Sequence, residues 1–428
     1  MSRIWSVYTA APHRVLFLPG AVQSVIAIAW WLLDIEIRQA GGAGLAIAGL
    51  PSPLLHGWLM VFGLFPFFVF GFLFTALPNW VSGPPISKAA YVASMFGLSI
   101  GTILLYLGES SLGLLAHLLG WSVAMRALLS SLRAGRDADK RHARATWVAL
   151  LIGAVAEAVM LAGLVFDYWE WLQPALELGI WGFLVPLFLS VCHRMIPFFT
   201  SRVAGAEPAP IKPGGLLPME AGSIRTPAGT RQQAGYVMIR PYPLLWAMWA
   251  ACLIHVGLFV NAWGYLTWLV DFPMAALVFW FSSRWGLLLS FKVRLLAMLH
   301  VAFLWAGAAF ALFGLDSLAG FLGLAWSAGN APLHALGIGF FGAMLIGMAS
   351  RVSLGHSGRA LLADAATWWL FWLIQGVALL RMLPDLSAGA LPARLASVAG
   401  LAWLLVFGVW AWKYAPMTWR PRVDGKAG

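Results

Sequence analysis

Histidine is the residue type in this sequence best suited to chemistry, because a neutral imidazole can ligate haem iron or copper. Two of the nine histidines, His56 and His334, each open a long apolar segment. One haem iron takes two axial ligands on opposite faces, so two histidines from two helices at one depth would satisfy it. We therefore take His56 and His334 as the candidate cofactor ligands.

The segment that follows His334 is rich in glycine. Its glycines are Gly337, Gly339, Gly342 and Gly347. Small residues let a neighbour approach a membrane helix closely. That neighbour is either the flat face of a macrocycle or simply another helix, and the spacing alone favours the helix.

A second group of histidines comprises His193, His300 and His356, with arginines close by in the sequence. These residues predict either a metal site or an anion site, and the alternative is that they are solvated loop residues and interface anchors. His300 is the strongest metal candidate because it lies within an apolar segment. The accompanying arginines are Arg194, Arg202 and Arg351.

Three further groups lie within apolar segments. Glu157 is either a proton-relay carboxylate or a protonated group bonded to a neighbouring helix. His117 lies in the segment before it. His255 follows Cys252 by three residues, so both share a helical face. The two side chains could ligate copper, but two groups are too few for a copper site. A hydrogen-bonded pair in the protein core is therefore the favoured interpretation.

The composition indicates the elements that must hold these side chains. The hydrophobic fraction is 61% and the charged fraction only 10%, whereas soluble domains carry about 25% charged residues. The chain is therefore an all-α polytopic membrane protein, since a membrane helix needs about 20 mainly apolar residues. Twelve spans are expected, near 15–33, 55–78, 89–107, 111–131, 146–166, 173–197, 243–262, 265–281, 296–315, 331–350, 366–383 and 395–412.

The basic residues indicate the orientation of these spans. With a cytoplasmic N-terminus, only Arg38, Arg381 and Arg394 of the 27 Lys and Arg fall on the outer side. This asymmetry predicts that both termini are cytoplasmic. It also accounts for the net charge of +11 through anionic lipids of the inner leaflet, without nucleic acid as a partner. His56 and His334 then both lie at outer helix ends, within about 5 Å in depth.

One long connection divides the predicted spans. Residues 198–242 are rich in Pro and Gly and lack a helical period, so they predict a cytoplasmic linker. The predicted domains are a first six-helix half at 1–197, this linker, and a second six-helix half at 243–428.

Four motifs together resemble the NnrS family. The first runs from HALGIG at 334–339 to MASRVSLGHSGR at 348–359. The others are GFLFTALPNW at 71–80, RMIPFFTSR at 194–202 and LLAMLH at 295–300. The resemblance implies a multi-pass protein of the bacterial inner membrane that binds haem b and copper and acts in nitric oxide metabolism or protection from nitrosative stress. The layout also resembles the catalytic subunit of haem–copper oxidases, with outer histidines on helices two and ten.

The sequence departs from the family at one place. The second helix of the family usually begins with His-x-His-Glu, and this chain has His56-Gly57-Trp58-Leu59. The resemblance therefore implies either fewer metal centres here or relocated ligands, with His117 as a replacement.

Three functional classes remain at this point. The leading one is a haem protein that handles nitric oxide or a related diatomic, and it includes a haem-dependent oxidoreductase. The second is a secondary transporter, which often has twelve helices in two sets of six. The third is an assembly or signalling factor that binds metal without redox turnover. A Soret band in the purified protein separates the first class from the transporter.

Overall fold

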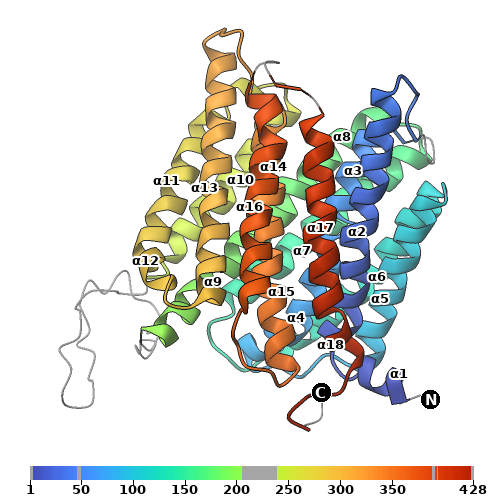
Figure 1. Cartoon of the computed structure of the whole chain (residues 1–428), viewed down its shortest axis with the longest axis vertical. Helices are drawn as coiled ribbons and strands as arrows, with labels where there is room; N and C mark the ends of the chain where they lie inside the picture. Colours follow the sequence, from blue (N-terminus) through green and yellow to red (C-terminus); the bar gives the residue numbers. More distant parts are fainter. Residues whose placement is uncertain (1–2, 46–49, 205–238, 388–390, 393, 426–428) are drawn as a thin grey trace.

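The apolar segments form long helices that run side by side in one bundle (Figure 1). This computed structural model describes residues 3–45, 50–204, 239–387, 391–392 and 394–425, and these contain no strand. The helices are α1 Arg3–Tyr8, α2 Pro12–Gln39, α3 Ser52–Val61, α4 Phe65–Val81, α5 Lys88–Tyr106, α6 Ser110–Ala134, α7 Arg141–Val165, η1 Trp169–Trp171, α8 Leu172–Leu178, η2 Gly179–Leu184, α9 Val185–Val203, α10 Tyr242–Val260, η3 Gly264–Leu266, α11 Trp268–Arg284, α12 Leu287–Ser290, α13 Arg294–Phe321, α14 Ala331–His334, η4 Ala335–Gly342, α15 Ala343–His356, α16 Ala365–Leu386, α17 Leu395–Tyr414 and α18 Pro416–Trp419.

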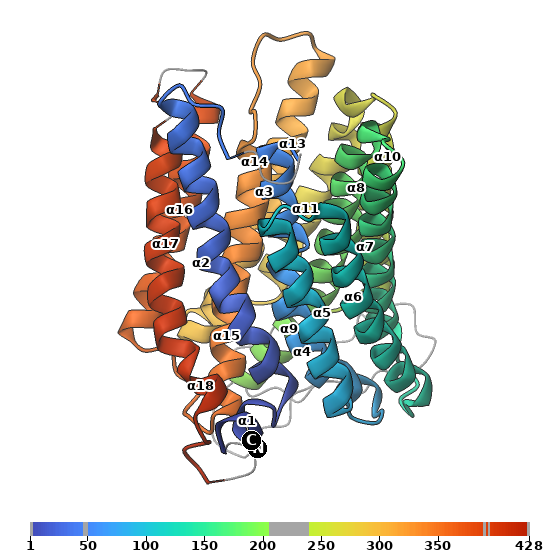
Figure 2. The ribbon, with the colours of Figure 1, turned by 90° about the vertical axis from the view of Figure 1, so that its right-hand side faces the viewer.

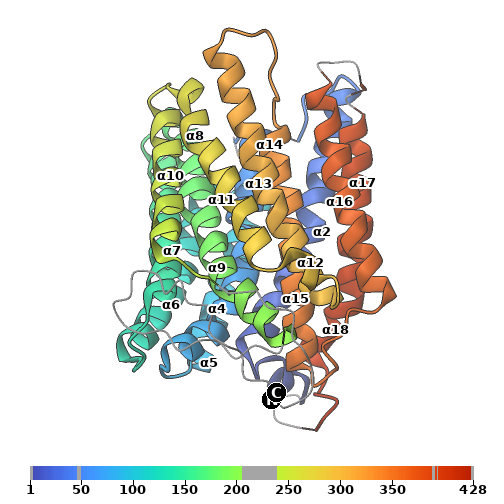
Figure 3. The same ribbon diagram turned by 90° about the vertical axis from the view of Figure 1, so that its left-hand side faces the viewer.

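Eleven helices of the described chain are long and apolar enough to cross a membrane, which confirms a multi-pass membrane protein. The predicted eighth span corresponds to α11, whose 17 residues rise by about 26 Å. It lies along α13 (Figure 3). Helices α1 and α18 contact each other at one end of the bundle. An odd number of crossings could not bring the chain back to that end. Helix α11, the eighth along the chain, therefore brings the number of crossings from eleven to twelve.

The shared position of α1 and α18 defines what we call the lower end of the bundle, and the opposite end is the upper end (Figure 1). Arg14 of α2 fixes this arrangement, because its Nη1 donates hydrogen bonds to the backbone oxygens of Thr418 and Arg420 at 3.4 and 2.9 Å. That the lower end is cytoplasmic stays a prediction. The linker predicted at 198–242 lies mostly outside the described residues, and the division into two halves also stays a prediction.

When α11 is counted as the eighth span, the three most buried spans are four spans apart along the chain. They are the second, sixth and tenth, namely Ser52–Val81, Trp169–Val203 and Ala331–His356, which are 78%, 78% and 72% buried. The remaining spans surround them and expose more apolar surface, as lipid-facing helices do. The candidate ligands His56 and His334 therefore belong to two of the three central spans.

Each central span departs from regular α-helix in its upper half. Turn residues 62–64 separate α3 from α4. Segments η2 and η4 are π-helices, a geometry often found at functional sites. Both π-helices coincide with a Leu-Gly-Ile sequence, at 178–180 and at 336–338. These interruptions were not expected from the sequence.

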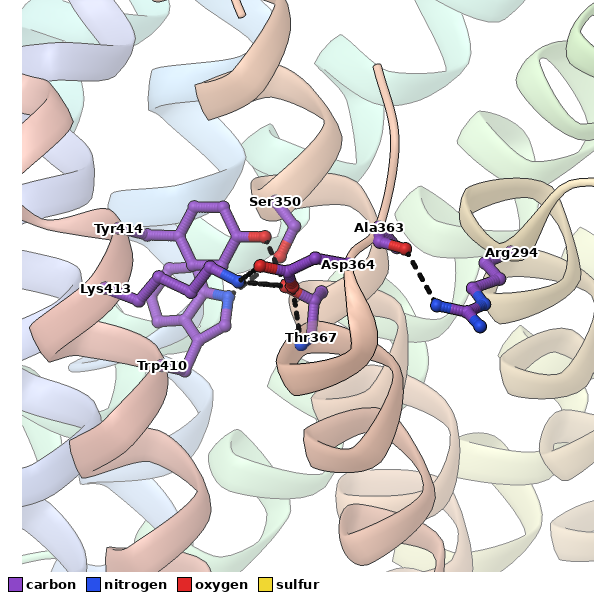
Figure 4. Close-up of polar contacts among 8 residues, drawn as sticks. All are labelled: Arg294, Ser350, Ala363, Asp364, Thr367, Trp410, Lys413 and Tyr414. Atoms are coloured by element: carbon purple, nitrogen blue, oxygen red, sulfur yellow. Dashed lines mark hydrogen bonds and ion pairs between the residues drawn. The ribbon is translucent and has the colours of Figure 1, made fainter. Parts of the chain in front are cut away.

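Polar contacts near the lower end tie the last helices together (Figure 4). Asp364 caps α16 by accepting a hydrogen bond from the backbone nitrogen of Thr367 at 3.0 Å, and it also pairs with Lys413 of α17. The Thr367 hydroxyl lies 2.7 Å from the Tyr414 hydroxyl. Further bonds run from Trp410 to Ser350 at 2.9 Å and from Arg294 to the backbone oxygen of Ala363 at 3.3 Å.

Candidate functional site

His56 and His334 lie near the upper end, each in the first turns of a central span. Proline can occupy the first turn of a helix, where its missing N–H has no helical partner. Pro53 and Pro332 do so in α3 and α14, and each precedes the histidine closely. Two perpendicular views place α3 and α14 beside each other at one level (Figures 1 and 2). The predicted match in depth is therefore present.

The two imidazoles lie close enough to influence each other electrostatically. His334 interacts electrostatically with His56 and with Arg381, and His56 also interacts with Arg381. The main packing partners of α14 are α13 and α16, whereas α3 packs on α2 and α8. Both histidines are half-buried. The two histidines thus lie on helices whose main packing partners differ.

The hydrogen bonding of His334 suits an iron ligand, and the ring of His56 is held by stacking. His334 Nδ1 donates to the backbone oxygen of Asn330 at 2.8 Å, which leaves Nε2 as the free lone pair. A metal-bound histidine typically donates its second ring nitrogen in this way. His56 has a buried Nδ1 without a hydrogen-bond partner among the described residues. Its ring stacks on Trp31 at 4.3 Å between centroids and 9° between planes.

The four glycines after His334 serve two different purposes. A Cβ on Gly339 would lie 2.4 Å from Trp305, one on Gly342 would lie 3.3 Å from Trp403, and one on Gly347 would lie 3.2 Å from Leu299. These three allow side chains of neighbouring helices to pack closely. A Cβ on Gly337 would meet no atom within 4 Å. The interpretation of all four as a macrocycle surface is therefore wrong for three, and Gly337 alone leaves open space, one turn from His334.

Two arginine–aspartate pairs flank the histidines. Arg38 pairs with Asp34 of α2 at 2.6 Å, and Arg381 pairs with Asp385 of α16 at 2.8 Å. Arg38 also covers Trp31, with 4.9 Å between its guanidinium carbon and the ring centroid. These cations are two of the three basic residues that the sequence places on the outer side. A guanidinium has five N–H donors, so each arginine can bind a further carboxylate.

The structure does not assemble the second predicted group. His193 lies 2.9 Å from His142, measured between ring nitrogens, and His300 Nε2 lies 3.0 Å from the Thr200 hydroxyl. His356 stacks near His13, with 4.3 Å between ring centroids. No group of three His, Cys, Asp or Glu side chains that could hold a metal ion occurs in the described part of the chain. The three histidines lie on three helices, α9, α13 and α15, and each contacts a different neighbour.

The arginines predicted beside that group stack on aromatic rings. Arg194 lies over Trp80, and Arg351 lies over Phe199, with 5.0 and 3.9 Å between the guanidinium carbon and the ring centroid. Arg202 covers Phe198 in the same way at 4.5 Å. Such cation–π contacts anchor arginines at a membrane interface and provide no common anion site.

His117 and Glu157 form a fully buried pair between α6 and α7. His117 Nδ1 lies 2.8 and 2.9 Å from the two carboxylate oxygens. Glu157 is thus bonded to a neighbouring helix, which was one of its two predicted interpretations. Trp58, which replaces the second histidine of the family motif, lies edge-on to His117 at 5.2 Å between centroids. His117 Nε2 has no partner among the described residues.

His255 forms a second buried pair of this kind, with Asp271. Its Nδ1 lies 2.8 Å from the Asp271 carboxylate, and its ring stacks on Trp181 at 3.5 Å between centroids. The predicted pairing of His255 with Cys252 is therefore wrong. Asp271 lies on α11, the span with the weakest sequence signal, which is why it was missed.

An apolar cavity of about 60 Å³ lies between the central spans. Its walls come from α2, α4, α9 and α15, and include Phe65, Phe188 and Met344. It has room for a few molecules the size of water, but all of its lining side chains are apolar. A small apolar molecule is therefore its best-matched occupant.

Comparison with known families gives one result. A family model described as NnrS protein matches residues 7–422. No curated protein matches the chain.

Proposed function

The chain belongs to the NnrS family, and on this premise we propose that it is a haem protein of the bacterial inner membrane that acts in nitric oxide metabolism or in resistance to nitrosative stress. The observation that carries the haem is that His56 and His334, in helices at one level of the bundle, interact electrostatically with each other and share Arg381 as a neighbour.

Haem b is the proposed cofactor, with His56 and His334 as axial ligands. The fit rests on three features of the protein. His334 already directs Nε2 away from its helix by bonding Asn330 through Nδ1. Trp31 fixes the plane of the His56 ring. Gly337 leaves free the space that any larger side chain would occupy. Each feature prepares the protein for a flat ligand before it binds.

Arg38 and Arg381 are the proposed partners of the haem propionates. Both interact electrostatically with His56, one from each side of the site. Their aspartate partners hold them in place, since both pairs join residues four apart on a helix. Two guanidinium groups would neutralise two carboxylates near the outer surface.

A haem held by His56 and His334 would supply one-electron redox chemistry at this level of the bundle. The protein's own residues would then hold the ring, exclude lipid and balance its charge. The apolar cavity between the central spans lies elsewhere and matches an uncharged diatomic. A transporter of polar solutes needs polar groups at such a site, so this cavity favours the haem-protein class over the transporter.

Copper is a further proposal that rests on the family alone. Within the described residues no three candidate ligands gather, so we assign no ligand set to it. Likewise, the reaction with nitric oxide is proposed as a class, an oxidoreduction coupled to the haem, without a catalytic residue.

The optical spectrum of the purified protein tests this proposal. Protein isolated from cells supplied with haem should show a Soret band and the α and β bands of low-spin haem b after reduction. A pyridine haemochrome assay gives the stoichiometry, expected to be one haem at this site per chain. A preparation that is folded and free of haem would contradict the proposal and leave the transporter class ahead.

A further inference from the structure

A continuous hydrogen-bonded chain leads from a loop at the lower end into the bundle. Tyr242, the first residue of α10, donates its hydroxyl hydrogen to Asp139 at 2.7 Å. The same hydroxyl lies 3.1 Å from His142 Nδ1, and His142 Nε2 lies 2.9 Å from His193 Nδ1. The four residues come from the loop before α7, from α7 itself, from α9 and from α10, which pack together (Figure 3).

All three links can be satisfied by one set of hydrogen positions. The Tyr242 hydroxyl donates to the Asp139 carboxylate, so its oxygen can accept from His142 Nδ1–H. His142 Nε2 then carries a lone pair and accepts from His193 Nδ1–H. His193 Nε2 is left with a lone pair. Each member therefore donates one hydrogen bond toward Asp139, which is the arrangement needed for successive proton transfer.

The two ends of the chain differ in their access to water. The Asp139 side chain is 22% exposed, whereas His142 and His193 are 1% exposed. The His193 ring contacts Phe281 and Trp285 edge-on at 5.5 and 5.9 Å between centroids, and its buried Nε2 has no partner among the described residues. An unsatisfied buried polar atom costs about 1–3 kcal/mol. A row of hydrogen bonds that served only to join helices would not need to end in an unpaired buried nitrogen such as His193 Nε2.

Charged groups around the hydrogen-bonded chain keep Asp139, at its water-exposed end, ionised. Burial raises the pKa of Asp139, but hydrogen bonds from Arg141 and Tyr242 outweigh this and hold the pKa below its usual value. Arg141 also covers the Tyr242 ring at 3.5 Å. From the other elements, Arg240 acts electrostatically on both histidines and Arg194 acts on His142. Asp139 is thus a carboxylate acceptor at neutral pH.

We propose that Asp139, Tyr242, His142 and His193 transfer a proton between water at the lower end and the interior beside His193. A proton that arrives on His193 Nε2 is matched by passage of its Nδ1 proton to His142 Nε2. The His142 Nδ1 proton then passes to the Tyr242 oxygen, and the phenol proton passes to Asp139 and water. In the reverse passage a proton from water reaches Asp139, His193 Nδ1 regains its hydrogen from His142, and the proton on His193 Nε2 leaves to the interior, so no net charge is created within the hydrogen-bonded chain. This shuttle does not depend on the haem.

Proton exchange at His193 tests the shuttle directly. The full-length protein, labelled with ¹⁵N-histidine and reconstituted in lipid bilayers, is studied by solid-state NMR, and the His193 signal is identified by its loss in His193→Gln. The measured quantity is the exchange rate of the His193 imidazole proton with water. We expect Tyr242→Phe, which removes only the hydroxyl, to slow this exchange at least tenfold.

Two further variants make the result decisive. Asp139→Asn should slow the exchange as well, and it replaces Tyr242→Phe as the test variant if Tyr242→Phe does not fold. Thr200→Val is the control, because it removes a buried hydroxyl that bonds another histidine, His300, and lies outside the hydrogen-bonded chain. It should exchange like the wild type. Equal exchange in the wild type and the two chain variants would contradict the proposal, as would no exchange in the wild type.

Discussion

The imidazole of His56 lies parallel to the indole of Trp31, with 4.3 Å between ring centroids and 9° between planes. This contact joins α2 and α3 into one wall of the candidate haem site, and Arg38 stands on the same indole. The opposite wall has the same chemical composition, with His334 on α14 and Arg381 on α16. Each wall thus offers one imidazole and one arginine held by an aspartate.

Filling the space beside His334 should exclude the haem. Gly337→Leu places a branched side chain where no atom now lies within 4 Å of a Cβ, so we expect haem content to fall severalfold while the protein still folds. The matched control is Gly408→Leu, since Gly408 of α17 also faces open space. The absorbance ratio of the Soret band to protein measures both. Full haem occupancy in Gly337→Leu would mean that the macrocycle lies elsewhere.

The arginines should set the potential of the haem. Arg381→Gln removes a cation that offsets propionate charge, so the ferric state gains stability and the midpoint potential falls. Arg38→Gln should act in the same direction, and the Lys variants should retain most of the wild-type value. Spectroelectrochemical titration measures the shift. A haem whose potential is unchanged in both Gln variants would rule out the two arginines as propionate partners.

The orientation of the bundle can be tested with reporter fusions. The basic residues predict that the lower end is cytoplasmic. A fusion within 205–238 and one at the C-terminus should therefore both be active on the cytoplasmic side. A periplasmic signal from both would invert the bundle and would move His56 and His334 to the inner leaflet.

Asp364 should stabilise the protein in a pH-dependent manner. Burial raises the pKa of Asp364, but hydrogen bonds from Lys413 and Thr367 outweigh this and lower it to about 2. A lowered folded-state pKa means that the carboxylate stabilises the protein above about pH 4, its unfolded range, and that this is lost as pH falls toward 2.

Asp364→Ala should cost about 0.5–2 kcal/mol, the usual value of a helix N-cap. The ion pair with Lys413 adds little, because the Asp364 side chain is 60% exposed. Thermal unfolding in detergent at pH 7 and at pH 3 measures the effect. The difference between wild type and variant should shrink at the lower pH, and a constant difference would contradict the assigned role.

Composition and charge were enough to predict the membrane class and the twelve spans, because lipid imposes long apolar helices on any sequence. The depth match of His56 and His334 also followed from span counting. Trp31, Arg38 and Arg381 could not be predicted as neighbours of that pair, because no sequence period relates residues on four different helices.

The buried pairs show the same limit. His117 and Glu157 were both candidates, yet only tertiary packing brings them together. His142 and Tyr242 were missed because each lies at the start of a helix, where polar residues are common and carry little information. The Leu-Gly-Ile sequence shared by the two π-helices was a usable signal for the interruption of both spans.

Replacement of the two proposed axial ligands tests the central claim most directly. His56→Ala and His334→Ala are each purified and compared with the wild type by optical and electron paramagnetic resonance spectroscopy. His300→Ala serves as a control for loss of a buried histidine that bonds only Thr200. We predict that each ligand variant loses the low-spin haem signal or converts it to high-spin, while His300→Ala keeps it. Wild-type spectra and full haem occupancy in both His56→Ala and His334→Ala would contradict the account.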